Sequence, residues 1–395
     1  MSIRLIFSLK PDMLFVIISI FIALYAGLHY YVYKKIIIIV PSGHWLIITI
    51  LGFLIFTPLL VALLADAGHT AIATPLAWVG YTWMGFVFLF FSFSVVLDLY
   101  RLLTKAGGRL LGVEASALML PSPYYSVFAA TVLTLMATGY GFFAARQINV
   151  EWIHIPTSKL DKTFDSFRIL QISDLHLGLL SDEMRLRHII ETIRSVHPDV
   201  VVSTGDLVDM QMDHLGKFAD LLHELKPRSG KFAVTGNHEA FAGLDQALAF
   251  TRRAGFTMLS YDGIKVNNVI NIVGVDDPAI SKSMKIGTPG ERYLLQQYPK
   301  EKFTVLLKHQ PVVDPASLEW FDLQLSGHTH GGQIFPFTLL TKLIYPAKTG
   351  LSRVGKNTWL YVSRGTGTWG PPIRFLAPPE LTVIELRSDT GVQGI

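Results

Sequence analysis

Residues 199–209 read DVVVSTGDLVD, an apolar run that ends in a glycine and an acidic turn. A short run of β-branched residues that stops at such a turn is typical of a buried strand. Gly205 lets the chain bend as it leaves the strand. Asp206 is then either a turn residue, since aspartate tolerates tight backbone, or a metal ligand. Which of the two applies depends on what the rest of the chain brings to the same edge of the sheet.

The alternation of strand and helix continues on both sides of this stretch. RILQIS at 168–173 and KFAVT at 231–235 read as further strands, and helices are predicted at 183–196, 214–225 and 244–254. Strands separated by helices of roughly ten residues predict an α/β sheet. More closely spaced strands follow at 257–261, 264–266, 269–275, 304–308, 323–326, 359–363 and 381–386. Their short spacing predicts additional antiparallel pairing.

The N-terminal third of the chain is too apolar for a soluble domain. The chain is 50% hydrophobic and only 16% charged, and the excess lies in the first 145 of its 395 residues. Apolar runs without Asp, Glu, Lys or Arg occupy 13–33, 45–65, 76–97 and 126–145. Each is near the roughly 20 residues that cross a bilayer. We therefore predict a four-helix transmembrane domain at 1–145, a linker with a first strand at 146–166, and a second domain at 167–395.

The first apolar run is too long for the core of a cleaved signal peptide, and three more runs follow it. The charged stretch after the third run, including 102–111, is expected to be an interfacial loop. With the loops after the first and third runs in the cytoplasm, five Lys or Arg residues lie inside and three outside. The positive-inside rule then predicts a multi-pass protein whose second domain lies on the extracytoplasmic side.

Charge and cysteine content exclude several classes of partner and site. The net charge of +4 carries no dense basic block, so no nucleic-acid partner is expected. The chain has no cysteine, which excludes disulfides and thiolate metal ligands. The apolar runs carry no charge that would mark an ion path.

Five predicted strand ends of the second domain carry oxygen or imidazole groups. In chain order these are Asp174 and His176; Asp206 and Asp209; Asn237, His238 and Glu239; His309; and His328 and His330. Sites in α/β sheets gather beyond the carboxyl ends of strands. A lone histidine or aspartate at such a position is usually a surface or turn residue, but that explanation would have to hold separately at all five ends. A mixture of imidazole and oxygen donors suits Mn, Fe or Zn ions.

These blocks, D-x-H, G-D-x-x-D, G-N-H-E, a lone His and G-H-T-H, resemble the calcineurin-like metallophosphoesterases. The resemblance covers about residues 167–386, and all five blocks occur in order. The GGQI after G-H-T-H and the tail SRGTGTWGPPIRFLAPPELTVIEL look like a bacterial subgroup of membrane-associated phosphodiesterases, some of which act on lipid-linked phosphates. The resemblance implies an αββα sandwich of two sheets with helices outside, in a bacterial cell membrane.

Carried over residue by residue, the resemblance implies two metal ions. Asp174, His176, Asp206 and His330 would hold the first, and Asp206, Asn237, His309 and His328 the second. Two cations bridged by one carboxylate can activate a water molecule as a nucleophile and clamp both oxygens of an in-line displacement. His238 would stabilise or protonate the leaving oxygen. We therefore predict a phosphoric ester hydrolase, in which Asp206 and His238 are the residues closest to the chemistry.

Other residues and the substrate are less constrained by the motifs. Asp209 is expected to orient a neighbouring histidine, with a plain turn role as the alternative. Arg364 and Arg374 could contact a substrate phosphate, or form ordinary salt bridges. The apolar segment 335–351 could form a lipid-facing rim of the site or a loop over the core. The expected substrate is a phosphate ester, possibly lipid-linked. The alternative function is a transporter or sensor with a regulatory metal-binding domain.

Overall fold

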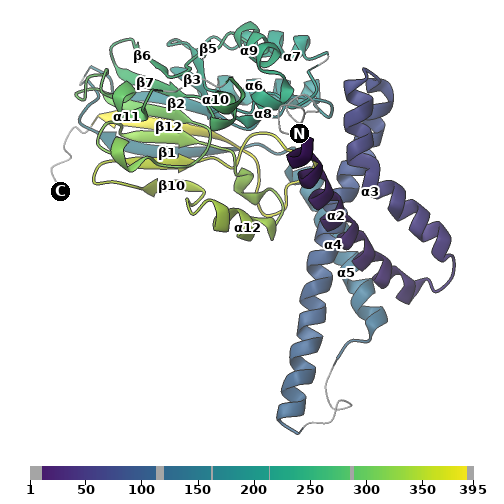
Figure 1. The fold of residues 1–395 in the computed structure, drawn as a ribbon. Coiled ribbons are helices and arrows are strands. Elements are labelled where there is room, and N and C mark those ends of the chain that lie inside the picture. The colour runs from purple at the N-terminus through teal and green to yellow at the C-terminus, as the bar shows by residue number, and fades with distance from the viewer. Residues whose placement is uncertain (1–10, 113–119, 162, 213, 285–288, 389–395) are drawn as a thin grey trace.

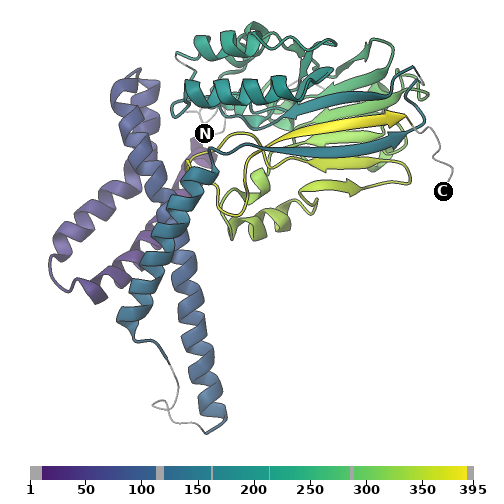
Figure 2. The same ribbon diagram turned by 180° about the vertical axis from the view of Figure 1, so that it is seen from behind.

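The computed structural model describes residues 11–112, 120–161, 163–212, 214–284 and 289–388, and Figures 1 and 2 show its fold. Long helices form the N-terminal part: α2 (Pro11–Ile39), α3 (His44–Asp66), α4 (Thr70–Leu110) and α5 (Pro123–Ala144). Among the described residues, α3, α4 and α5 are long and apolar enough to cross a membrane. The predicted run at 13–33 lies within α2, but the predicted count of four membrane spans is not confirmed.

Helix α4 is longer than the predicted span at 76–97. It begins at Thr70 and continues to Leu110, so the expected interfacial loop at 102–111 is helical almost to its end. The polar residues that follow the apolar run do not stop the helix, and Asp98 among them has partners in another helix. Asp98 accepts a hydrogen bond from Tyr31 at 2.6 Å and pairs with Lys35 at 2.7 Å, which ties α4 to α2.

The C-terminal domain contains two six-stranded sheets. The first has the order β1 (Asn149–Thr157), β12 (Glu380–Ser388), β2 (Ser166–Ile172), β3 (Val200–Ser203), β4 (Lys231–Ala233), β5 (Thr257–Met258). The second has the order β10 (Gly350–Arg353), β11 (Trp359–Val362), β9 (Leu323–Ser326), β8 (Phe303–Lys308), β7 (Ile270–Val275), β6 (Asp262–Val266). The prediction of a two-sheet α/β domain is confirmed.

The later strands form the predicted additional antiparallel pairs, β6 with β7, β10 with β11 and β12 with β2, but most neighbours in the second sheet are parallel. Strands β7, β8, β9 and β11 pair in parallel, and only β6 and β10 at the two edges pair antiparallel in the second sheet. Parallel neighbours need a crossover connection. Short helical segments that the sequence did not indicate provide it: α10 (Pro278–Met284), α11 (Glu291–Leu295) and a 3₁₀ turn at Pro315–Ser317.

Apolar side chains fill three layers of the domain. Ile169 and Val202 of the first sheet face Ile272, Val305 and Leu325 of the second, so the sheets pack face to face. The outer face of the first sheet is covered by α6 (Glu183–Ser195), α7 (Gly216–His223) and α9 (Leu244–Arg253). The outer face of the second sheet packs on α11. The result is a helix–sheet–sheet–helix arrangement, seen edge-on in Figure 1.

The apolar periodicity of α6 explains its place in these layers. Leu186, Ile189, Ile190 and Ile193 recur at helical spacing and are all buried against the first sheet. The helix begins after Asp182, whose carboxylate accepts the amide of Met184 at 3.0 Å. Such an N-cap satisfies one of the free amides of the first turn.

The helices and the C-terminal domain share an extensive contact. The amide of Arg374 donates to the carbonyl of Gly141 in α5 at 2.9 Å, and the Gln211 side chain donates to the carbonyl of Ala65 in α3 at 3.1 Å. Apolar side chains from both parts form one cluster: Leu89, Ala137, Ile334 and Ile373. The domain therefore lies against the side of the helices, as both views show.

Candidate metal centre

Five loops carry the predicted ligands to one edge of the two sheets. They follow β2, β3, β4, β8 and β9, and β2–β3–β4 and β8–β9 each pair in parallel. Parallel strands end at a common edge, so the loops after them meet there. Backbone hydrogen bonds join the loops directly: Asp174 N donates to Gly205 O at 3.1 Å, and Gly327 N donates to His309 O at 2.9 Å.

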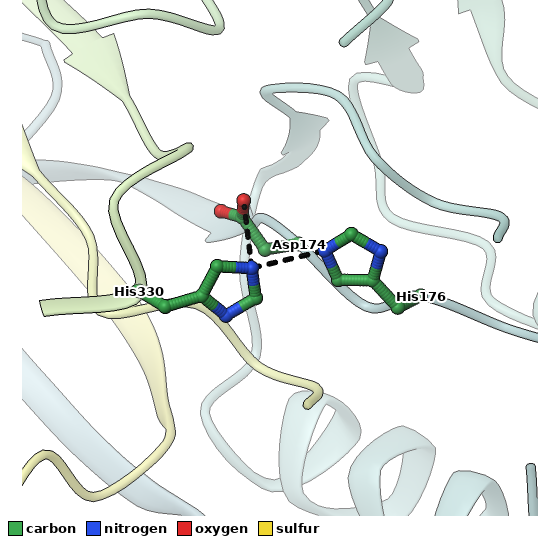
Figure 3. A group of neighbouring side chains, drawn as sticks. All are labelled: Asp174, His176 and His330. Carbon is green, nitrogen blue, oxygen red and sulfur yellow. Dashed lines mark hydrogen bonds and ion pairs between the residues drawn. The ribbon is translucent and has the colours of Figure 1, made fainter. Parts of the chain in front are cut away.

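One group of side chains brings together Asp174, His176 and His330 (Figure 3). The Nε2 atoms of the two histidines lie 3.0 Å apart, and His330 Nε2 lies 3.5 Å from Asp174 Oδ1. All three side chains are buried. In the figure, dashed lines join the His330 ring both to the Asp174 carboxylate and to the His176 ring.

A second group brings together Asp206, Asn237, His309 and His328. Asn237 Oδ1 lies 3.1 Å from His309 Nε2 and 3.0 Å from His328 Nδ1, and these two nitrogens are 3.1 Å apart. His309 Nε2 lies 3.2 Å from Asp206 Oδ2. The amide oxygen of Asn237, rather than its NH₂, is the atom that faces the histidines, as a metal ligand requires.

Asp206 lies between the two groups. Its Oδ2 atom is 3.2 Å from His309 Nε2 in the second group and 3.8 Å from His176 Nε2 in the first. Its other oxygen accepts the backbone amide of His238 at 2.8 Å. The carboxylate is therefore placed where one residue can serve both groups.

The backbone of the ligand loops is unusual. Five predicted ligands have a positive φ: Asp174 (52°), His176 (48°), Asp206 (53°), His328 (71°) and His330 (51°). This left-handed conformation costs about 1–2 kcal/mol for each non-glycine residue. Residues adopt it when the surrounding structure determines their conformation, and such residues cluster at functional sites.

Buried hydrogen bonds hold these loops in place, and glycines let them approach one another closely. The Glu239 carboxylate accepts the amides of Asp206 at 3.0 Å, Leu207 at 2.8 Å and Gly236 at 2.7 Å. A Cβ atom on Gly236 would overlap the Asp206 carboxylate, and one on Gly327 would overlap Asp174. Glu239 is thus a structural support of the site, and both glycines are needed for the close approach of the loops.

The protonation of the site fits a cation. Burial lowers the pKa of His176 to about 4 and that of His328 to about 3, and burial with the nearby Arg374 holds the pKa of His330 well below its usual range. These three imidazoles are therefore neutral and can donate lone pairs. Although burial opposes both shifts, the charges of His309 and Asp206 raise the pKa of His309 and lower that of Asp206. A cation that bound Asp206 would displace the proton from His309.

His238 and Asp209 form a pair beside the two groups. His238 Nδ1 lies 2.9 Å from Asp209 Oδ1, and the His238 ring packs edge-on against His176 with centroids 4.5 Å apart. Burial would lower the pKa of His238, but Asp206 and Asp209 raise it above its ordinary value. The imidazole is therefore oriented by Asp209 through Nδ1, which leaves Nε2 for another partner.

The two arginines form contacts within the domain, and for Arg364 these are the salt bridges that the sequence analysis gave as the alternative. Arg374 has no exposed surface, and its guanidinium donates to the carbonyls of His330 at 2.9 Å and Arg364 at 2.7 Å and contacts His330 Nδ1 at 3.1 Å. Arg364 forms ion pairs with Glu151 and Glu380. The structure places Arg374 behind His330 rather than facing a substrate, because its donors are taken up by backbone carbonyls.

Tyr345 belongs to the site although no motif marked it. Its hydroxyl lies 2.8 Å from His328 Nε2, on the side of the ring away from Asn237. It follows α12 (Phe337–Ile344), in the apolar segment whose sequence indicated only a rim or a loop. Partners of this kind fix the tautomer and orientation of a ligand histidine, but they come from segments without a local signature.

Comparison with known proteins gives a consistent result. Residues 167–332 match the family model described as calcineurin-like phosphoesterase. An uncharacterized metallophosphoesterase of Aquifex aeolicus is 36% identical over 65% of this chain and 98% of its own length. A transmembrane protein with metallophosphoesterase domain of Danio rerio is 32% identical over 76% of this chain and 70% of its own. An uncharacterized metallophosphoesterase of Bacillus subtilis is 34% identical over 66% of this chain and 95% of its own length.

Proposed function

Because the chain belongs to the calcineurin-like phosphoesterase family, we propose that it is a membrane-anchored hydrolase of phosphate esters, acting on diesters with two metal ions. The observation that carries this proposal is the position of Asp206 between two groups of buried imidazole and oxygen donors. Asp174, His176, Asp206 and His330 would hold one ion, and Asp206, Asn237, His309 and His328 the other. The chemistry that ions of the Mn, Fe or Zn class supply here is activation of water and neutralisation of phosphoryl charge.

The residues of the chain itself provide the metal ligands and a proton donor. Neutral His176, His328 and His330 offer lone pairs without first losing a proton. Asp209 holds His238 through Nδ1 and favours its protonated form. We assign His238 the donation of a proton from Nε2 to the leaving oxygen, a role that general acid catalysis gives to histidine.

Removal of metal tests this function directly. The purified full-length protein is expected to hydrolyse bis(p-nitrophenyl) phosphate, to lose this activity on treatment with EDTA, and to regain it with Mn²⁺. Absorbance of released p-nitrophenolate measures the rate, and mass spectrometry of the dialysed protein measures bound metal. Hydrolysis that persisted after the metal had been removed would contradict the two-metal site.

We further propose that the domain lies on the extracytoplasmic side of a bacterial cell membrane. The excess of Lys and Arg on the loops after the first and third apolar runs supports this orientation. Helix α2 begins at Pro11 beside the C-terminal domain, and α5 returns to the domain at Ala144 (Figures 1 and 2). The start of α2 and the end of α5 therefore lie on the same side of the helices as the C-terminal domain.

Helix α12 supports a substrate that lies in the bilayer. The helix has no buried residue, and its exposed side chains include Leu339, Leu340, Leu343 and Ile344. Phe337 at its start packs on Phe88 of α4 with ring centroids 6.1 Å apart, so the apolar face continues that of the long helices. An amphipathic helix of this kind lies in a membrane interface, and its end carries Tyr345, which contacts His328.

Introduction of a charged residue on α12 is expected to slow the hydrolysis of a lipid substrate but not that of a soluble one. Leu343 is 80% exposed, and Leu343→Lys should lower hydrolysis of a phospholipid diester in nanodiscs by about fivefold, since about 1 kcal/mol of apolar burial is lost. Hydrolysis of bis(p-nitrophenyl) phosphate should stay unchanged. Tyr293→Lys, at an exposed apolar position on α11, is the control. Equal loss on both substrates would reject an interfacial role for α12.

A further inference from the structure

A cavity of about 100 Å³ lies between the long helices and the metal centre. One wall comes from the end of α3, with Val61, Ala62 and Ala65, and from Tyr81 of α4. The facing wall comes from the loop after β2 and the first turns of α6. The cavity is part of the contact between the helices and the domain, and nothing in the metal site requires it.

The cavity reaches the reacting centre at one end. His176, a predicted ligand, and Asp209, which holds His238, both contribute to its lining. An ester group of a substrate bound at the metal centre can therefore extend into the cavity.

The wall formed by α3 and α4 carries the apolar side chains of Val61, Ala62 and Ala65 beside Asp66 and Tyr81. Val61 and Ala65 are buried in the contact, while Leu59, Leu60 and Leu63 of the same turns are exposed. On the domain side, Leu177, Leu186 and Ile189 complete the lining. A chain of methylene groups is the kind of group that such a surface binds.

Arg185 adds a polar feature to this cavity. It lies in the first turn of α6, and its Nη2 donates to the carbonyl of Thr366 at 3.0 Å. Its Nε is buried without a hydrogen-bond partner, and no ion pair of Arg185 occurs among the described residues. Burial lowers its pKa to about 10, so the group remains charged at neutral pH. A buried guanidinium with a free N–H needs an acceptor, and the cavity is where an acceptor can come from.

We propose that this cavity binds the non-reacting part of the substrate, an apolar chain that carries an oxygen acceptor such as an ester carbonyl. The apolar chain of the substrate lies along Val61, Ala62 and Ala65, and Arg185 binds the acceptor oxygen of that chain. The substrate class is thus an acylated phosphate ester that reaches the metal centre along α3. This assignment rests on the proposed phosphoesterase function and specifies what that site acts on.

Alkylphosphonates of increasing length test the apolar part. Their inhibition constants are measured against hydrolysis of bis(p-nitrophenyl) phosphate by the full-length protein. Each methylene group that enters the cavity should tighten inhibition by about fourfold, until the cavity is filled. Methylphosphonate, which is too short to enter, provides the baseline.

Filling the cavity should remove this dependence on length. Ala62→Trp is expected to give inhibition constants that no longer change from methyl- to hexylphosphonate. Ala62→Leu should give a smaller effect in a variant that disturbs the helix less. The matched control is Leu63→Trp, on the exposed side of the same turn. Leu63→Trp should keep the length dependence of the wild type. If Ala62→Trp kept it as well, the alkyl chain of the inhibitor would not bind in this cavity.

A second pair of inhibitors tests Arg185. A phosphonate with an ester group in its chain should bind the wild type about tenfold more tightly than an alkylphosphonate of equal length, because the hydrogen bond is charged. Arg185→Gln should abolish that preference, and Arg185→Lys should keep part of it. Equal binding of both inhibitors to the wild type would show that Arg185 does not bind an oxygen of the substrate. Lack of any hydrolysis of the soluble diester would instead overturn the proposed function, so the two failures are distinct.

Discussion

Replacement of Asp206 by asparagine is expected to lower kcat/KM for bis(p-nitrophenyl) phosphate by about 10³-fold or more. The change keeps the shape of the side chain but removes the charge that lies between the two ligand groups. The variant would hold both proposed ions less tightly. Such ions would supply several kcal/mol of transition-state stabilisation, and each 1.4 kcal/mol is tenfold in rate. Bound metal, measured by mass spectrometry, should fall with the activity.

The comparison with other variants makes this prediction specific. The Asp174 carboxylate lies among the side chains of the first group and accepts only the backbone amide of His328 from the second. The loss of activity in Asp174→Asn should therefore be smaller than that in Asp206→Asn. Asp220→Asn, in an exposed pair with Arg253, is the control and should behave as the wild type. The asparagine oxygen can still accept the His238 amide, so the melting temperature should change little. Wild-type activity in Asp206→Asn would show that the carboxylate is only a turn residue.

The second large effect concerns His238. Its replacement by alanine is expected to lower kcat by about 10²–10³-fold for an alkyl ester, because the leaving alkoxide then lacks a proton donor. For a p-nitrophenyl ester the loss should be much smaller, since nitrophenolate leaves without protonation. The ratio of the two rates, measured with the same protein preparation, reports on the role of His238 independently of the protein concentration.

Two further variants separate proton donation from structure. Asp209→Asn should give a smaller loss of the same kind, about tenfold, because it removes the carboxylate that orients His238. His188→Ala, at an exposed position of α6, should leave both rates unchanged. An equal loss on both esters in His238→Ala would mean that the side chain supports the fold of the site and does not donate a proton.

The parts of this architecture that could be predicted from sequence have local signals. The run VVVST and its neighbours are continuous apolar segments, so the strands of the parallel core were identifiable one by one. The ligands directly follow those strands, and parallel pairing alone brings them to one edge. The structure brings these side chains together in groups of His and Asp, two of which include Asp206.

The parts that sequence did not reveal depend on contacts between distant segments. Tyr345 meets His328, and Arg374 meets His330, only once the loops are packed. Nothing in a single arginine distinguishes one that faces phosphate from one that is buried behind a ligand. The length of α4 depends in the same way on Asp98, whose partners Tyr31 and Lys35 lie in another helix.

The strand order of the first sheet has a consequence for how the protein is made. Strand β12 lies between β1 and β2, and it pairs in parallel with one and antiparallel with the other. During translation β1 and β2 leave the ribosome early, while their common partner emerges only after all the ligand loops. Until then two strand edges beside the membrane remain open, which is the state most prone to wrong pairing. Helices α2–α5 are synthesised first and can already hold the chain at the bilayer. The first sheet is therefore completed there, after all the ligand loops have been made, when β12 pairs with β1 and β2.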